Sequence, residues 1–156
     1  MDALRKQEVP FLLIDGGDFF HRNQRNNFPE SIATWTDMHR IGYDAVTLGE
    51  MELEQWDLVD SLQQMMPLPL VVSNVEIQRD GVWQPVADRY RIIESNDLRI
   101  GFISTISEGQ VNQTALDRSS GTFRILPPMS TTTELIAELR SRVDILVLIE
   151  IGRAHV

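Results

Sequence analysis

The chain has 156 residues, 42% of them hydrophobic and 24% charged, which is the composition of one globular domain and excludes a disordered chain. Its net charge of −9 excludes a nucleic-acid partner bound through phosphates, because such binding needs clustered Lys and Arg. The chain has no cysteine, so disulfides and thiolate chemistry are excluded, and no apolar run has the roughly 18–20 residues of a membrane span.

The first predicted elements are a strand, a helix and a second strand. Pro10–Asp15 is an apolar run that ends in an acid and is followed by glycines, which predicts a buried strand leading into a loop. Asn27 is a candidate N-cap for a helix that Gly42 would end. Asp44–Leu48 reads as the next strand, ended by Gly49.

A second helix and a third strand follow. Residues 52–64 have apolar side chains at helical spacing, and Leu70–Ser73 is a further buried run. The order strand, helix, strand, helix, strand with short connections predicts an α/β fold with crossover helices and a mostly parallel sheet.

The second half of the chain is richer in β structure. Tyr90–Ile93 and Leu98–Ser104 flank the turn signal Ser95-Asn96-Asp97, which predicts a hairpin. The polar stretch 109–122 predicts a loop, and Phe123–Ile125 a short strand.

The last predicted elements are a helix and a strand. Thr131 and Glu134 form a possible capping box for a helix through Leu139, and Val143–Ile149 predicts one more buried strand. Residues 151–156 are what a common sequencing adapter encodes when translated in one frame. We therefore expect residues 1–150 to form one partial domain and residues 151–156 to be a non-native tail in which His155 has no role.

Two acids follow predicted strands and are candidate metal ligands. Asp18 comes just after the first strand behind Gly16-Gly17, and Glu50 comes just after the second strand. If the strands are parallel neighbours, both carboxylates lie at one sheet edge, where α/β folds bind ligands and where hard oxygens hold divalent cations. The alternatives are an ordinary loop with a capping acid at Asp18, and acids at 50 and 52 that favour a helix N-terminus through its dipole.

Together these segments resemble the calcineurin-like metallophosphoesterases, in the branch of the bacterial 5'-nucleotidases and UDP-sugar hydrolases. That family reads Leu-Leu-Asp-Ala-Gly-Asp where this chain has Leu13–Asp18, and Gly-Tyr-Asp-Ala-x-x-Leu-Gly-Asn-His-Glu where it has Gly42–Glu52. Three later strands also fit in order: Pro69–Asn74, Arg99–Ser104 and Val143–Leu148. The resemblance implies an αββα sandwich, of which this chain is a part.

The resemblance also implies a chemistry. Two divalent metal ions, Mn or Zn, would stabilise the attacking and leaving oxygens during hydrolysis of a small phosphorylated substrate such as a nucleotide. By position, Asp18 would be the aspartate that bridges the metals, and Glu50 would take the place of the metal-binding asparagine. Asn74 matches an asparagine of the family pattern and is assigned no ligand role.

The chain departs from the family at the catalytic motif. Met51 stands where the family has its assisting histidine, and methionine can neither transfer a proton nor donate a hydrogen bond. No catalytic residue is therefore assigned. Two hypotheses remain: a metal-dependent phosphoric ester hydrolase whose fragment is inactive alone, or a non-catalytic relative kept for binding or structure. A nucleotide-binding domain without metals ranks last, because the sequence has no glycine-rich phosphate loop.

Other polar residues carry less weight. His21 is expected to be a solvated loop residue, and His39 a structural residue near a helix C-terminus. The polar stretch 23–27 is expected to be an exposed loop. The compartment is not decided: the resemblance suggests a periplasmic or extracellular protein, and residues 1–6 lack the apolar stretch of a signal peptide.

Overall fold

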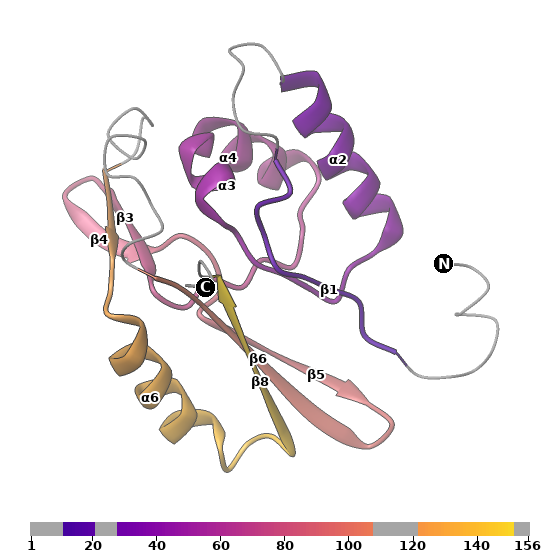
Figure 1. The fold of residues 1–156 in the computed structure, drawn as a ribbon, viewed down its shortest axis with the longest axis vertical. Coiled ribbons are helices and arrows are strands. Elements are labelled where there is room, and N and C mark those ends of the chain that lie inside the picture. The colour runs from indigo at the N-terminus through magenta and orange to yellow at the C-terminus, as the bar shows by residue number, and fades with distance from the viewer. Residues whose placement is uncertain (1–10, 21–27, 108–121, 152–156) are drawn as a thin grey trace, which may run out of the picture.

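The computed structural model describes residues 11–20, 28–107 and 122–151, which form helices and short strands in two layers of β structure (Figure 1). The helices are α2 (Phe28–Ile41), α3 (Glu50–Glu54), α4 (Trp56–Met65) and α6 (Pro128–Leu139). The strands are β1 (Ile14–Asp15), β2 (Ala45–Val46), β3 (Val75–Arg79), β4 (Val82–Pro85), β5 (Tyr90–Ser95), β6 (Leu98–Ile106), β7 (Thr122–Ile125) and β8 (Ile145–Ile151).

The first strand, helix and second strand form as predicted, although the strands are short. β1 pairs with β2 in parallel, with Ile14 opposite Ala45. α2 ends at Gly42, whose φ of 76° lies in the left-handed region and whose N–H bonds the Met38 carbonyl at 3.1 Å. The expected buried strand at 10–15 is only partly right, because strand pairing begins at Ile14 and residues 11–15 are half-buried.

The single helix predicted over residues 52–64 is wrong, because two helices form with a break at Gln55. Gln55 has φ −111° and ψ 36°, outside the helical region. Met51, Glu52 and Leu53 are buried in a row, and three consecutive residues cannot share one helix face. The break lets α3 bury these residues while α4 turns Trp56 toward the core.

Residues 70–74 form a buried segment that begins beside β2. Val71 N–H bonds the Val46 carbonyl at 2.8 Å, and Val72 N–H bonds the Asp88 carbonyl at 2.9 Å. The segment forms isolated bridges rather than the predicted full strand, and its Leu70 pairs in parallel with Val46. It is followed by β3 and β4, a hairpin that the sequence reading missed, which joins β7 in the antiparallel order β4-β3-β7.

The predicted hairpin at 90–104 is confirmed and forms the centre of the second layer. β5 and β6 pair antiparallel around Asn96 and Asp97, and β8 pairs in parallel on the other side of β6. β8 begins and ends two residues later than the predicted strand, and its last residue is Ile151, the first residue of the suspected tail. Residues 152–156 lie outside the described part of the chain.

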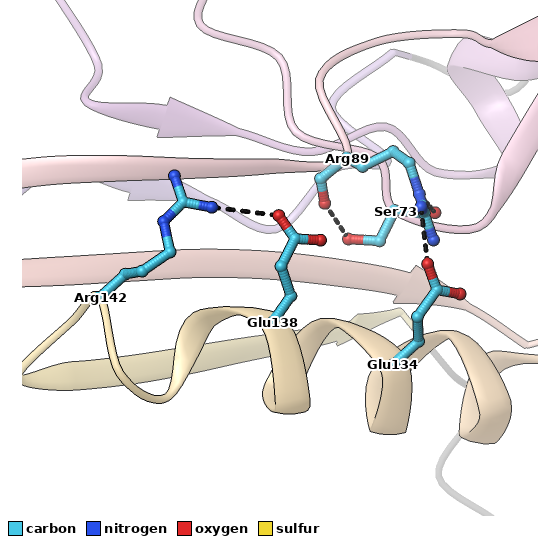
Figure 2. A network of polar contacts seen from close by, with 5 residues as sticks. All are labelled: Ser73, Arg89, Glu134, Glu138 and Arg142. Carbon is cyan, nitrogen blue, oxygen red and sulfur yellow. Dashed lines mark hydrogen bonds and ion pairs between the residues drawn. The ribbon is translucent and has the colours of Figure 1, made fainter.

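α6 begins earlier than predicted, and its expected capping box does not form. Pro128 opens the helix, which places Thr131 inside its first turns, buried at 3% exposure. Glu134 instead pairs with Arg89 at 3.0 Å, across to the start of β5 (Figure 2). Arg89 is fixed further by its own carbonyl, which accepts the Ser73 hydroxyl at 2.5 Å, so α6 is joined to the segment of residues 70–74.

The packing of the two layers gives an αββα order. α2, α3 and α4 lie on one side of the strands and α6 on the other (Figure 1). Phe102 of β6 packs with Ala45 and Val71 between the layers, whereas Ile103, the next residue, packs under Leu135 of α6. The αββα sandwich with crossover helices is therefore confirmed, and the sheets are only partly parallel rather than mostly parallel. Among the described residues, no helix combines the length and apolarity that a membrane crossing requires.

Candidate functional site

The parallel pairing of β1 and β2 brings the two predicted acidic loops to the same edge. Asp15 lies opposite Val46, and Thr47 N–H continues the pairing to the Asp15 carbonyl at 3.1 Å. The loop with Asp18 and the loop with Glu50 therefore leave neighbouring strands in the same direction. This is the arrangement that the sequence reading required of them.

Two glycines allow these loops to touch. Gly17 has φ 83°, and a Cβ there would lie 2.8 Å from the Gly49 nitrogen. A Cβ on Gly49 would in turn lie 2.8 Å from the Asp18 nitrogen. Any larger residue at either position would push the loops apart, since real Cβ contacts are not that short.

Asp18 is held in an unusual backbone conformation with an exposed side chain. Its φ of 57° is left-handed, a conformation that Asp tolerates better than most residues but that still costs free energy. Its Oδ1 accepts the backbone N–H of Met51 at 3.2 Å, at the start of α3. The residue as a whole is exposed, and the start of α3 orients its carboxylate.

Glu52 is the residue that the sequence reading missed. Its side chain is fully buried, and its carboxylate accepts three backbone N–H groups from both loops. Oε2 accepts from Gly49 at 2.8 Å and Asp18 at 2.9 Å, and Oε1 accepts from Phe20 at 2.7 Å. The sequence suggested only that Glu52 favours the N-terminus of its helix. That role accounts for the bond from Gly49 but not for the bonds from Asp18 and Phe20.

Burial is the main influence on the ionisation of Glu52. It raises the pKa of this carboxyl from 4.5 to about 7, because a charge in a dry environment is disfavoured. The three amide hydrogen bonds act in the opposite direction, since they favour the ionised form. The nearby charge of Asp18 adds a smaller rise.

The two motif positions before Glu52 differ in their surroundings. Glu50 is the first residue of α3 and is half-buried. Met51 is 7% exposed and belongs to the apolar cluster around Trp35 and Trp56. At the position of the family's assisting histidine, this chain therefore has a core residue.

Asn74 has a structural role, and its side chain is occupied by backbone groups. Its amide nitrogen donates to the carbonyls of Ile106 and Leu126, both at 2.9 Å. Its oxygen accepts the Ile106 N–H at 2.9 Å. This buried side chain joins the end of β6 to the segment after β7.

The remaining candidates are core residues or lie outside the described chain. Trp35, Met38 and Trp56 are buried in the apolar core. His39 contacts the Pro67 carbonyl at 3.1 Å, which agrees with a structural role. His21 and residues 23–27 lie outside the described residues.

The described residues do not by themselves fit a metal centre of the two-ion kind. Carboxylate oxygens such as those of Asp18 and Glu50 suit hard divalent cations. However, within residues 11–20, 28–107 and 122–151 no group of three or more His, Asp or Glu side chains is arranged to hold a metal.

The fold of the chain can be compared with those of solved structures. No protein-family model and no curated protein sequence matches the chain. The NAD nucleotidase of Haemophilus influenzae superposes over 96% of the chain with a TM-score of 0.76 and 18% identity. The 5'-nucleotidase precursor of Thermus thermophilus superposes over 96% with a TM-score of 0.74 and 21% identity.

A third similar structure is the calcineurin-like phosphoesterase YfkN of Bacillus subtilis, which superposes over 99% of the chain with a TM-score of 0.72 and 19% identity. The chain has the fold of the calcineurin-like metallophosphoesterases in the form found in 5'-nucleotidases, which confirms the resemblance read from its sequence. It spans 26%, 29% and 53% of these three chains, so it corresponds to a part of each.

Proposed function

We propose that the chain is part of a metal-dependent phosphoric ester hydrolase of the 5'-nucleotidase type, and that it is inactive without the rest of that protein. The observation that carries the proposal is the contact between the two acidic loops: the carboxylate of Asp18, an exposed residue, accepts a backbone N–H of α3 immediately after Glu50. Parallel strands that end in converging acids are where such folds place their reacting groups.

The proposal assigns limited roles to the residues of this chain. Asp18 and Glu50 would supply oxygen ligands to a divalent cation, Mn or Zn, and the cation would stabilise negative charge on a phosphoryl group. The substrate would be a small phosphorylated molecule, with a nucleotide as the first choice because the structural neighbours include nucleotidases. The other ligands would come from residues outside the described part of the chain.

A second candidate function is a non-catalytic domain of the same fold, used for binding or structure. The burial of Met51 favours this alternative, because a thioether in the apolar core cannot assist a leaving group. Fold alone does not decide between the two, since one fold serves many activities.

The test is made on the complete parent protein. We expect it to bind Mn or Zn and to release phosphate from a nucleoside monophosphate, with loss of activity in Asp18→Asn and after chelation. Met51→His should raise the rate if the site is otherwise complete, and a melting curve should show that the imidazole is tolerated in the core. If the wild type and Met51→His both bind metal but release no phosphate, the non-catalytic alternative is established. If no metal is bound, the proposed roles of Asp18 and Glu50 as metal ligands are refuted.

A further inference from the structure

A buried carboxylate that accepts three backbone amides needs a physical reason. Transfer of an ionised group from water to a protein interior is costly unless it is paired or hydrogen-bonded. Glu52 is fully buried, and its carboxylate accepts hydrogen bonds from the N–H groups of Gly49, Asp18 and Phe20. The bonds from Asp18 and Gly49 reach the same oxygen, so one atom joins the two loops.

The contact between the loops is reciprocal. Glu52 of α3 accepts the backbone N–H of Asp18, and Asp18 accepts the backbone N–H of Met51 in α3 with its own side chain. Asp18 is therefore fixed both at its backbone nitrogen and at its carboxylate. These two bonds hold Asp18 in its left-handed backbone conformation, with its carboxylate against α3.

We propose that Glu52 is a positioning residue that sets the orientation of the Asp18 carboxylate through the Asp18 backbone. The orientation itself is independent of the proposed function; its importance for a cation rests on that function. The ordinary consequence of losing an outer partner of a metal ligand is a fall of about 10–100-fold in metal affinity. A helix-capping role alone would require only the bond from Gly49, and does not explain the bonds from Asp18 and Phe20.

The test follows the backbone amide of Met51 by NMR in the 156-residue chain. Asp18→Gly gives the reference signal, because glycine accepts the left-handed φ and removes the carboxylate that Met51 contacts. In Glu52→Gln, a neutral amide cannot accept three N–H groups, so the Met51 signal should move at least halfway to its position in Asp18→Gly.

The control is Leu135→Ala, which destabilises the chain by opening a cavity under α6, on the far side of the second sheet. In Leu135→Ala, the amide signal of Met51 should keep its wild-type position. If Glu52→Gln does not fold, Glu52→Asp should shift the signal in the same direction by a smaller amount. An unmoved Met51 signal in the folded Glu52 variant, whichever folds, overturns the positioning role.

A separate arm tests the proposed function. Excess Mn²⁺ should broaden the amide signals around Asp18 and Met51 in the wild-type chain, and about tenfold more Mn²⁺ should be needed in Glu52→Gln. If Mn²⁺ broadens neither loop in the wild type, the metal role of Asp18 fails. The Met51 shift would still decide whether Glu52 positions the Asp18 carboxylate.

Discussion

At the scale of single residues, the site depends on groups that are costly in isolation. Asp18 adopts a left-handed backbone, and Glu52 keeps a carboxylate in the core. Each is compensated by the other's loop, through the Asp18–Glu52 and Met51–Asp18 hydrogen bonds. Strained or buried polar groups of this kind concentrate where a protein must hold a reactive geometry.

The ionisation of Glu52 makes stability depend on pH. Its pKa is raised from 4.5 to about 7 in the folded chain, so the folded state holds this proton more tightly than the unfolded state. The resulting stabilisation is complete below pH 4.5 and is lost as the pH rises to about 7. At about 1.4 kcal/mol per pKa unit, the free energy of unfolding should fall by roughly 3 kcal/mol over this range.

Urea denaturation of the wild type and Glu52→Gln at several pH values checks this expectation. The difference between the two free energies should change with pH in this window, because glutamine does not titrate there. Parallel curves would show that Glu52 has an ordinary pKa in the folded chain, and that burial does not control its charge.

The sequence predicted that the loops of Asp18 and Glu50 leave neighbouring parallel strands, but it did not predict that Glu52 joins these loops. Glycines behind an acid at a strand end are a strong local signal, and the parallel pairing follows from the short connections. Glu52 matches the last residue of the family pattern, but it was given no more than a helix-dipole role, because an acid in the first turn of a helix is common for that reason alone. Its role depends on bonds from Asp18 and Phe20, which are 34 and 32 positions away in the chain.

At the scale of elements, periodicity predicted the helices but not their breaks. The apolar residues of 52–64 fit one helix, yet Gln55 separates α3 from α4 because the residues before it are buried together. The β3–β4 hairpin was not predicted, because the exposed positions of β4 leave no clear alternation of apolar and polar side chains. Its turn does carry a signal, Asp80-Gly81, whose φ values are 51° and 78°.

The turn between β5 and β6 can be improved. Asn96 and Asp97 both have left-handed φ values, 50° and 64°, as a two-residue hairpin turn with the favoured twist requires. Asp97→Gly should stabilise the chain by up to about 1 kcal/mol, because glycine adopts this φ without steric cost.

Asp97→Ala is the matched control for that substitution. It also removes the carboxylate but keeps the Cβ, so it should not stabilise the hairpin. Thermal melting of the wild type and the two variants distinguishes an effect of the backbone conformation of residue 97 from an effect of its charge. Equal stabilisation by glycine and alanine would mean that the charge of Asp97, rather than its backbone, limits the turn.

At the scale of the whole molecule, the β1–β2 sheet packs face to face with the β5–β6–β8 sheet, and the loops of Asp18 and Glu50 lie at one edge of the first. Phe102 lies between the layers while Ile103 faces α6, so the alternation along β6 builds both interfaces. The buried Ser104 hydroxyl bonds the Val71 carbonyl at 2.7 Å and contacts Thr47 at 2.5 Å, which joins the layers close to the loop of Glu50. The packing of the sheets therefore helps to hold the loops of Asp18 and Glu50 in place.

The proposed function requires that the carboxylates of Asp18 and Glu50 face one cation site. The most direct measurement is a crystal structure of the chain soaked in excess Mn²⁺, with anomalous data collected at the manganese edge. The account predicts one anomalous peak within coordination distance of both Asp18 and Glu50. A peak that lies elsewhere, or electron density in which the two side chains point to opposite sides of the loops, would contradict it.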